Sequence, residues 1–404
     1  MKIKRRQKLV LVLAMAGMNL LLPAYGRSSA LEINKTEILP RRDAAAAGQP
    51  AYSPAAANSK EDPGTDLERI RNRVIADLLE PAVHEAAVRQ LMTAIGPGGS
   101  WPGINYQDVS RTGFQHSRHL EHMLAMSRAY KKPDSGLYRD PGLKKAVAAA
   151  LDFWLAHDFI CDNWWWNEMG TPNLMINTLL VLDADLTEEQ RQQGLRIAGR
   201  ANLAASGARP GGDLIQIAAM LGKQALFSRD QQVLEKVVQV MAQEIKVTTG
   251  RGLKPDLSFH HRTDNVISTL AYGTGYASSF AYWAVKIAGT RFTLPDEAMK
   301  LLVDYFLDGI CQSMVYGTYP DPGAKNRGIT RQDALHAVGP ELARNLLLAS
   351  DYRKKELAEI VKIRQGEKKA PGPPGLHSTL SSLSCHTQRS LNLASCSSGL
   401  SLRG

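Results

Sequence analysis

The sequence predicts an all-α domain, and three observations support that fold class. Between residues 66 and 349, apolar residues recur at helical spacing in about ten segments. No run shows the period-two alternation of β-branched and aromatic residues that is typical of a strand. Turn signals leave only short connections between most segments, which favours antiparallel helical hairpins stacked in an arc or ring, with longer loops at one rim.

The helical segments follow one another with recognisable starts and stops. Apolar residues at helical spacing begin at Leu67, and Glu80-Pro81 ends or kinks this first segment. Capping residues open two later segments, in Thr187-Glu188-Glu189 and in Ser228-Arg229-Asp230. We expect further helices at 114–131, 142–157, 171–184, 187–205, 213–226, 229–247, 275–288, 295–316 and 331–349.

The N-terminal residues 1–26 have the layout of a secretory signal peptide. A positively charged start is followed by an apolar stretch at 9–22 and by small residues at Ala24-Tyr25-Gly26. The apolar run of about 14 residues is shorter than the ~20 that span a bilayer, so we predict cleavage rather than a membrane anchor. The expected location is extracellular or periplasmic, with no membrane span after signal removal.

Residues 27–63 and 366–404 differ in composition from the helical region. The first stretch is rich in Ala, Ser and Pro and predicts a flexible leader. The second is rich in Ser, Pro and Gly and predicts a disordered or aberrant tail. The functional domain is therefore expected at 64–365.

The net charge of +10 is concentrated at the two ends of the chain. Residues 1–26 carry five positive charges and residues 367–404 a net three, so the remainder carries 10 − 5 − 3 = +2. The bulk basicity therefore gives no argument for a nucleic-acid partner.

Metal binding is weakly indicated. His116, His119 and His122 share one predicted helix, but no HExxH motif or nearby carboxylate pattern completes a zinc site, so we expect them to support neighbouring loops. No CxxC motif occurs either. Cys161 and Cys311 lie in apolar helical context, where they could form a bridge or remain buried thiols.

The segment 162–168 is the densest cluster of unusual residues. Three consecutive tryptophans point in different directions on any regular backbone, so they cannot all enter one core. Flat aromatic faces flanked by amides and a carboxylate suit stacking against sugar rings and bonding to sugar hydroxyls. The alternative is a packing plug beneath a helix start. The candidate substrate-binding residues are Asn163, Trp164, Trp165, Trp166, Asn167 and Glu168.

A second motif runs from 254 to 262 and continues through 272–276. Its imidazoles, guanidinium and phenols supply a base, an anion clamp and a proton donor, and its glycines permit close approach of a ligand. The alternatives are a solvated histidine pair and a tyrosine in the core. The candidate residues are His260, His261, Arg262, Tyr272 and Tyr276.

The third motif is the loop at 319–331. Arg327 and Arg331 are four residues apart at a predicted helix start, where they can share one face and bind a carboxylate or sulfate in a bidentate manner. The alternative is a surface loop in which they pair with Asp321 or Asp333.

Taken in order, these motifs resemble the N-terminal catalytic domain of the family 8 polysaccharide lyases. The resemblance covers roughly residues 65–350 and depends on the segments at 101–114, 163–182, 255–261 with 273–276, and 326–331. It implies an incomplete α/α toroid that carries a cleft. In the family β-sandwich domains follow this toroid and contribute residues near the site, and this chain looks truncated before them.

The resemblance also implies roles for individual residues. Trp164 and Trp165 resemble the aromatic patch that stacks the sugar. His261 resembles the catalytic histidine and Tyr276 the catalytic tyrosine, with Arg327 supporting it.

Two departures from the family pattern matter. The family His and Tyr are seven to nine residues apart, whereas His261 lies fifteen residues from Tyr276 and eleven from Tyr272, so Tyr272 and also His260 stay candidates. Arg331, by contrast, fits the pattern, because it resembles a second arginine that binds the uronate. Arg209 stands near the position of the family's carboxylate-neutralising Asn, and an arginine can also neutralise a carboxylate.

The implied activity is β-elimination from a uronate-containing acidic polysaccharide, such as chondroitin or hyaluronan, to 4,5-unsaturated products. Arg209, Asn163 and His261 would stabilise the developing carboxylate charge. Tyr276, with its pKa lowered by Arg327, would take the C5 proton, and His261 is the alternative base. We expect a monomer that needs no cofactor or metal.

Two other functions fit the same sequence. A truncated fragment could bind glycan with little or no turnover, because the β domains are absent. A hydrolase on the same toroid would need two carboxylates ~5–10 Å apart, and inside the motifs only Glu168 and Asp256 are available.

Overall fold

The structure is a computed structural model that describes residues 63–369, except 265 and 332. The chain divides into two units, residues 1–52 and 53–404, and every described residue belongs to the second. The predicted signal peptide, residues 27–62 of the predicted leader and residues 370–404 of the predicted tail lie outside the described residues. Among the described residues, no helix combines the length and apolar character needed to cross a bilayer.

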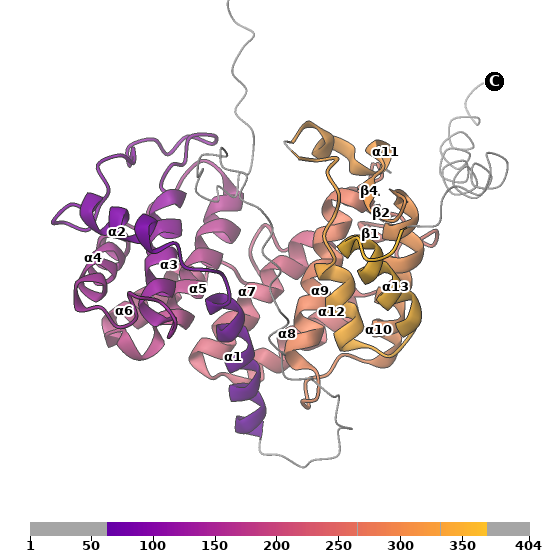
Figure 1. The fold of residues 1–404 in the computed structure, drawn as a ribbon, viewed down its shortest axis with the longest axis horizontal. Helices are drawn as coiled ribbons and strands as arrows, with labels where there is room; N and C mark the ends of the chain where they lie inside the picture. The colour runs from indigo at the N-terminus through magenta and orange to yellow at the C-terminus, as the bar shows by residue number, and fades with distance from the viewer. Residues whose placement is uncertain (1–62, 265, 332, 370–404) are drawn as a thin grey trace, which may run out of the picture. The chain divides into compact units, whose positions relative to one another are not determined.

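Helices make up most of the described region (Figure 1). The first half contains α1 (Pro63–Leu79), α2 (Glu85–Ala94), α3 (Ser117–Lys131), α4 (Pro141–His157), α5 (Thr171–Leu182), α6 (Glu188–Ala198) and α7 (Gly212–Ser228). The second half contains α8 (Gln231–Glu244), α9 (Thr274–Ile287), α10 (Asp296–Asp304), α11 (Pro322–Lys325), α12 (Glu341–Ala349) and α13 (Lys354–Gln365).

Shorter elements connect these helices. Wide π-helical turns form η1 (Trp166–Gly170), η3 (Thr269–Gly273) and η4 (Tyr305–Ile310), and tight 3₁₀ turns form η2 (Asp183–Asp185), η5 (Cys311–Ser313) and η6 (Asn326–Thr330). Two antiparallel pairs of two-residue strands occur in the described residues, β1 (Gly252–Leu253) with β2 (Phe259–His260) and β3 (Met314–Val315) with β4 (Tyr319–Pro320).

The helices form two rows, as the short connections predicted. Helices α3, α5, α7 and α9 each contact the next and make the inner row, and α4, α6 and α8 pack behind them as hairpin partners. Helix α1 contacts α3, α5, α7, α8 and α9, so it joins the first and second halves of the row (Figure 1). One continuous apolar core runs through the described residues from Leu67 to Leu357.

Most predicted helices are confirmed, with differences at their ends. The capping box of Thr187 with Gln190 and the cap of Asp230 on Val233 begin α6 and α8. The helix expected at 331–349 begins only at Glu341, directly after Pro340, whose ring disfavours a helical residue before it. Helix α6 ends at residue 198 rather than 205, and α2, α11 and α13 were not predicted.

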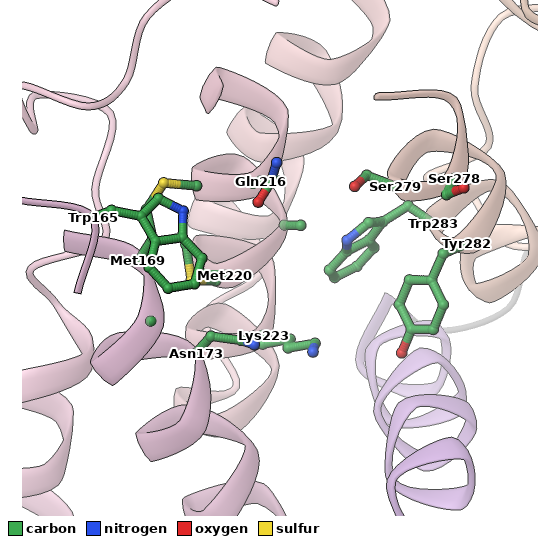
Figure 2. Close-up of a pocket in the computed structure, with 12 residues that line it drawn as sticks. Trp165, Met169, Asn173, Gln216, Met220, Lys223, Ser278, Ser279, Tyr282 and Trp283 are labelled. Atoms are coloured by element: carbon green, nitrogen blue, oxygen red, sulfur yellow. The ribbon is translucent and has the colours of Figure 1, made fainter. Parts of the chain in front are cut away.

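A cavity of about 350 Å³ lies among α5, α7 and α9 (Figure 2). Trp165 lies at one side of it, and Trp283 and Tyr282 of α9 face it from the other. Lys223 of α7 reaches into it beside these aromatic residues. The cavity therefore borders the predicted Trp motif.

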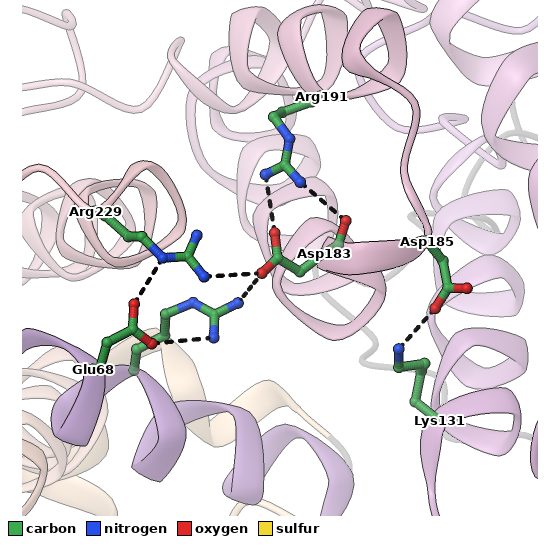
Figure 3. A network of polar contacts seen from close by, with 7 residues as sticks. Glu68, Lys131, Asp183, Asp185, Arg191 and Arg229 are labelled. Carbon is green, nitrogen blue, oxygen red and sulfur yellow. Dashed lines mark hydrogen bonds and ion pairs between the residues drawn. The ribbon is translucent and has the colours of Figure 1, made fainter.

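One carboxylate ties three helices together away from this cavity. Asp183, in η2, bonds Arg71 of α1, Arg191 of α6 at 2.9 Å and Arg229 at the end of α7 at 3.4 Å (Figure 3). Glu68 of α1 bonds Arg229 at 2.7 Å and completes the network. Because Asp183 is only slightly exposed, its three cations are needed to offset its burial.

The three histidines at the start of α3, the first of them its N-cap residue His116, support the loop before this helix, as expected. His119 is fully buried, and its two ring nitrogens lie 2.9 Å from the Tyr106 hydroxyl and 2.9 Å from the Ala150 carbonyl oxygen. His116 Nε2 lies 2.8 Å from the Tyr106 carbonyl oxygen, and His122 packs edge-on against Trp101. The histidines thus fix the segment around Tyr106. No group of three His, Cys, Asp or Glu that could hold a metal ion occurs in the described residues.

The two cysteines of the helical region do not form a bridge. Cys161 and Cys311 are both free and buried, so of the two alternatives the structure has buried thiols. Cys161 Sγ lies 3.7 Å from the Asn163 carbonyl oxygen, and Cys311 Sγ accepts from Arg364 at 3.4 Å. The two thiols therefore belong to separate polar environments.

Buried His119 makes stability depend on pH. Burial lowers its pKa from 6.5 to about 4, so the unfolded chain takes up this proton first as the pH falls. Above pH 6.5, neutral His119 makes its full contribution to the free energy of unfolding. This contribution decreases by roughly 3 kcal/mol as the pH falls from 6.5 to about 4. We expect His119→Gln to show a correspondingly shallower acid dependence in urea titrations between pH 7.5 and 4. Exposed His336→Gln should keep the original dependence, and an unchanged slope in His119→Gln would contradict the assignment.

Candidate active site

The candidate site is organised around Asp213, in the first turn of α7. Its buried Oδ2 lies 3.1 Å from Arg251 Nη2, 3.5 Å from Arg209 Nη2 and 4.0 Å from His261 Nε2. Burial raises the pKa of Asp213, and the arginines oppose that shift. Gly211, with φ of 92°, makes the turn that opens α7 and places this carboxylate.

His261 and Tyr272 form a parallel stack next to this carboxylate. Their ring centroids are 3.6 Å apart and their planes differ by 3°. The Arg327 guanidinium also contacts Tyr272, at 5.2 Å from its ring centroid. Burial and the nearby Arg251 and Arg327 lower the pKa of His261 to about 4, so its imidazole is neutral at neutral pH. Its Nδ1 is buried without a hydrogen-bond partner.

The local backbone explains how the stack forms. The loop after β2 returns so that Ser268 N–H donates to the Phe259 carbonyl oxygen at 2.7 Å, which brings η3 and Tyr272 beside β2. Asn326, with φ of 53°, donates from its amide to Ser268 Oγ at 3.0 Å. This bond joins the turn that carries Arg327 to the loop that carries His261.

The arginine cluster, Arg209, Arg251, Arg262 and Arg327, surrounds His261. All four lower the pKa of His261, after the effect of burial. Arg331 lies next to the cluster and, with burial and Arg262, lowers the pKa of Arg327. Such mutual repulsion favours an anionic ligand.

The alternative partners of the arginine loop are engaged elsewhere. Asp321 accepts from the Gly323 N–H at 2.6 Å as a helix cap, and Asp333 pairs with His336 at 3.2 Å. Arg327 lies beside Tyr272 instead, and the exposed Arg331 is close enough to act on the charge of Arg327.

The three tryptophans enter three different environments, as the sequence predicted. Trp164 is half-buried and packs against the small cluster around Met169 and Met220. The Arg209 guanidinium lies 4.6 Å from its ring centroid. Trp165 is 39% exposed and lines the cavity. Trp166 packs into the main core.

The polar residues of this motif hold the backbone instead of facing a ligand. Asn163 is buried, donating to the Arg111 carbonyl oxygen at 3.3 Å and accepting from the Trp165 N–H at 3.1 Å. Asn167 donates to the Cys161 carbonyl oxygen at 2.7 Å and accepts from the Cys161 N–H at 3.1 Å. Both amides are thus engaged by the backbone in this structure, and their bonding to sugar hydroxyls stays a prediction.

Glu168 likewise fixes a loop. Its carboxylate accepts from Ser206 Oγ and from the Gly207 N–H, both at 2.7 Å. Gly207 lies so close to Trp164 that a Cβ there would be 2.4 Å from the indole ring. Glu168 therefore positions the loop that carries Arg209 beneath Trp164.

Tyr276 is not at the site. It is 1% exposed in the core, where its hydroxyl donates to the Glu244 carbonyl oxygen at 2.8 Å, and burial raises its pKa. Its assignment as the catalytic tyrosine is corrected, because Tyr272 is the phenol that meets His261 and Arg327.

His260 also lies apart from the arginine cluster. It sits in β2, with Nε2 3.3 Å from Ser258 Oγ, and its charged neighbours are Lys254, Asp256 and Asp264. Of the two histidines, only His261 approaches Asp213. Asp213 and Arg251 were missed by the sequence reasoning, because an acidic residue in a first helical turn and an arginine in a loop are both ordinary features.

The comparisons with known proteins place this chain among the polysaccharide lyases. It matches the model described as "Polysaccharide lyase family 8, N terminal alpha-helical domain" over residues 79–363, so the chain belongs to this family. It is 25% identical over 273 residues to chondroitinase-AC of Pedobacter heparinus, covering 67% of this chain and 38% of that protein. It is also 25% identical over 214 residues to a hyaluronate lyase of Staphylococcus aureus, covering 47% of this chain and 25% of that protein. The chain thus spans less than half the length of both relatives.

Solved structures show the same fold. A chondroitinase AC lyase studied with oligosaccharide complexes superimposes with a TM-score of 0.71 at 22% identity, covering 76% of this chain and 45% of that one. The Streptomyces coelicolor chondroitin AC lyase in complex with chondroitin sulphate gives a TM-score of 0.58 at 17% identity, covering 80% and 48%. The predicted fold class, an all-α incomplete α/α toroid of antiparallel helical hairpins, is confirmed.

The carboxylate of Glu168 should be structural. We expect Glu168→Ala to lower the free energy of unfolding by about 2–3 kcal/mol, because two hydrogen bonds to a charged acceptor are lost. Hydrogen exchange at the Gly207 amide should accelerate at the same time. Exposed Glu297→Ala is the matched control and should cost below about 1 kcal/mol. Unchanged exchange at Gly207 in Glu168→Ala would contradict this role.

Proposed function

We propose that this domain cleaves uronate-containing acidic polysaccharide, a glycosaminoglycan such as chondroitin or hyaluronan, by β-elimination to 4,5-unsaturated products. The observation that carries the proposal is the stack of neutral His261 on Tyr272 within the arginine cluster. Membership of the lyase family and the names of the two relatives support it.

The arginine cluster supplies the electrostatic part of the reaction. The C5 proton of a uronate is barely acidic until the charge that develops on the neighbouring carboxylate is stabilised. Guanidinium groups fixed before the substrate binds stabilise that charge without reorganising in the transition state. Arg327 and Arg331, exposed at the site, are the bidentate donors for the carboxylate, and Arg209 takes the neutralising role.

Tyr272 carries the proton transfers. In its deprotonated form the Tyr272 oxygen takes the C5 proton, and the electron pair of the C5–H bond forms the C4=C5 double bond as the C4–O bond breaks towards the leaving oxygen. The Tyr272 hydroxyl formed in this way then gives its proton to that oxygen, which regenerates the deprotonated form. His261, stacked on this ring, fixes its orientation. His261 is a weak base in the free protein, because its pKa is about 4. Tyr272 is therefore the better candidate for the base.

We also propose that the chain is exported and acts outside the cytoplasm as a monomer. The charged start and the apolar stretch at 9–22 support export. A polymeric substrate too large to enter a cell is consistent with that location.

An assay with the full chain tests the reaction type. Hyaluronan, chondroitin sulfate and xanthan are each incubated with the protein, following ultraviolet absorbance of the unsaturated uronate alongside reducing ends. We expect both signals to rise together on at least one glycosaminoglycan. Reducing ends without the absorbance would replace the lyase by a hydrolase, and retained glycan binding with neither signal would favour a binding fragment.

Mutagenesis distinguishes the roles of Tyr272 and Tyr276. We expect Tyr272→Phe to lower kcat at least ~10³-fold while glycan affinity stays within about threefold, because only the proton-transfer group is lost. Tyr276→Phe is the matched control, since it should keep kcat and lose roughly 1–2 kcal/mol of stability with the buried bond to Glu244. Full activity in Tyr272→Phe would remove this residue from the mechanism.

A further inference from the structure

The cavity among α5, α7 and α9 is lined by a lysine, Lys223, that the proposed reaction does not use. Lys223 lies on α7 ten residues after Asp213, which is about 15 Å along the helix axis. Its ammonium group is thus well separated from the arginine cluster at the start of the same helix. Gln216 and Met220, on the same face of α7, line the cavity along the way (Figure 2).

The environment of Lys223 leaves positive charge in excess. Its Nζ donates to Asn177 Oδ1 at 2.8 Å, a neutral partner, and lies 5.9 Å from the Tyr282 ring centroid. The charged groups that face it are Asp77 of α1 and Arg128 of α3. Asp77 forms its ion pair with Lys286 of α9 instead, and also bonds the Tyr282 hydroxyl.

Among the described residues, the carboxylate that acts on Lys223 is therefore already paired with another ammonium group, that of Lys286. Arg128 donates to a neutral acceptor, the Leu78 carbonyl oxygen, at 2.8 Å. Burial lowers the pKa of Lys223 to about 8, as expected for an ammonium group whose charge is incompletely balanced. An anion beside Lys223 would restore that balance.

The other walls of the cavity suit a sugar ring. Trp165 offers an exposed indole at one side. Ser278 and Ser279 of α9 and the amides of Asn173 and Gln216 add donors and acceptors for hydroxyl groups. A volume of about 350 Å³ is within the usual range for small-ligand pockets.

We propose that this cavity is a separate subsite for one acidic sugar, whose carboxylate or sulfate pairs with Lys223 while its ring lies near Trp165. The choice of a sugar rests on the proposed function, whereas the requirement for an anion rests on the charges around Lys223. The ligand has two sources, the end of a polysaccharide chain or a free acidic monosaccharide.

Calorimetric titration of the full chain with three monosaccharides tests the subsite. The probes are glucuronic acid, N-acetylgalactosamine 4-sulfate and neutral N-acetylgalactosamine, at pH 7. We expect at least one acidic probe to bind at least ~10-fold more tightly than the neutral one. Lys223→Met should abolish this preference, and Lys300→Met, which removes an exposed ammonium group, should keep it.

The pH dependence of the unmodified chain gives a second readout that does not depend on the variant folding. Affinity for the acidic probe should fall at least fivefold between pH 7 and pH 9.5, because Lys223 loses its proton near pH 8 while arginines stay charged. Equal binding of acidic and neutral probes, or acidic binding that is unchanged in folded Lys223→Met and flat with pH, would overturn the subsite.

Competition identifies the source of the sugar. An acidic monosaccharide that inhibits polysaccharide cleavage competitively would support occupation by a chain end, and binding without inhibition would support a site for the free sugar. A chain that cleaves no glycan would refute the proposed lyase function, yet monosaccharide binding would still be measured directly. The two proposals therefore fail by different results.

Discussion

The candidate site depends on one buried carboxylate. Asp213 is the anion that allows Arg209 and Arg251 to lie beside His261, because guanidinium groups at this spacing would otherwise repel one another. Its position in the first turn of α7 is favourable, since the positive end of the helix dipole stabilises a negative charge there. Helix α7 also packs on α5, α8 and α9, so the same element that places the carboxylate anchors the inner row. A disturbance of α7 would therefore reach the core and the site together.

The wide turns in front of α5 and α9 explain how neighbouring residues receive different roles. In a regular α-helix Tyr272 and Tyr276, four residues apart, would share one face. The π-helical segment η3 ends at Gly273, between them, and changes the helical phase, so that Tyr272 faces His261 and Tyr276 enters the core. Segment η1 begins at Trp166 of the Trp motif and leads into α5 in the same way. Such turns are frequent at functional sites.

The sequence predicted what local patterns determine and missed what distant contacts determine. Helical periodicity and caps such as Thr187 gave most of the helices, because both signals lie within a few residues. Glu168 looked like a ligand for sugar hydroxyls, and its actual partner, Gly207, is 39 residues away. Tyr276 was preferred over Tyr272 on its resemblance to the family motif, although the eleven residues from His261 to Tyr272 are nearer to the family spacing of seven to nine. Asp213 was overlooked because its importance comes from arginines that arrive from three other loops.

The arginine cluster at the start of α7 differs in its chemistry from Lys223, which lies further along the same helix. At its start, arginines remain charged at any physiological pH and are partly exposed, so they hold an anion in reach of solvent. The floor of that region, formed by Asp213 and His261, is buried and fixed before any substrate arrives. Its outer face, with Arg262, Arg327 and Arg331, is open. Electrostatic stabilisation grows as water is excluded, so in the proposed reaction a polysaccharide lying over these arginines would strengthen the interaction on which its cleavage depends.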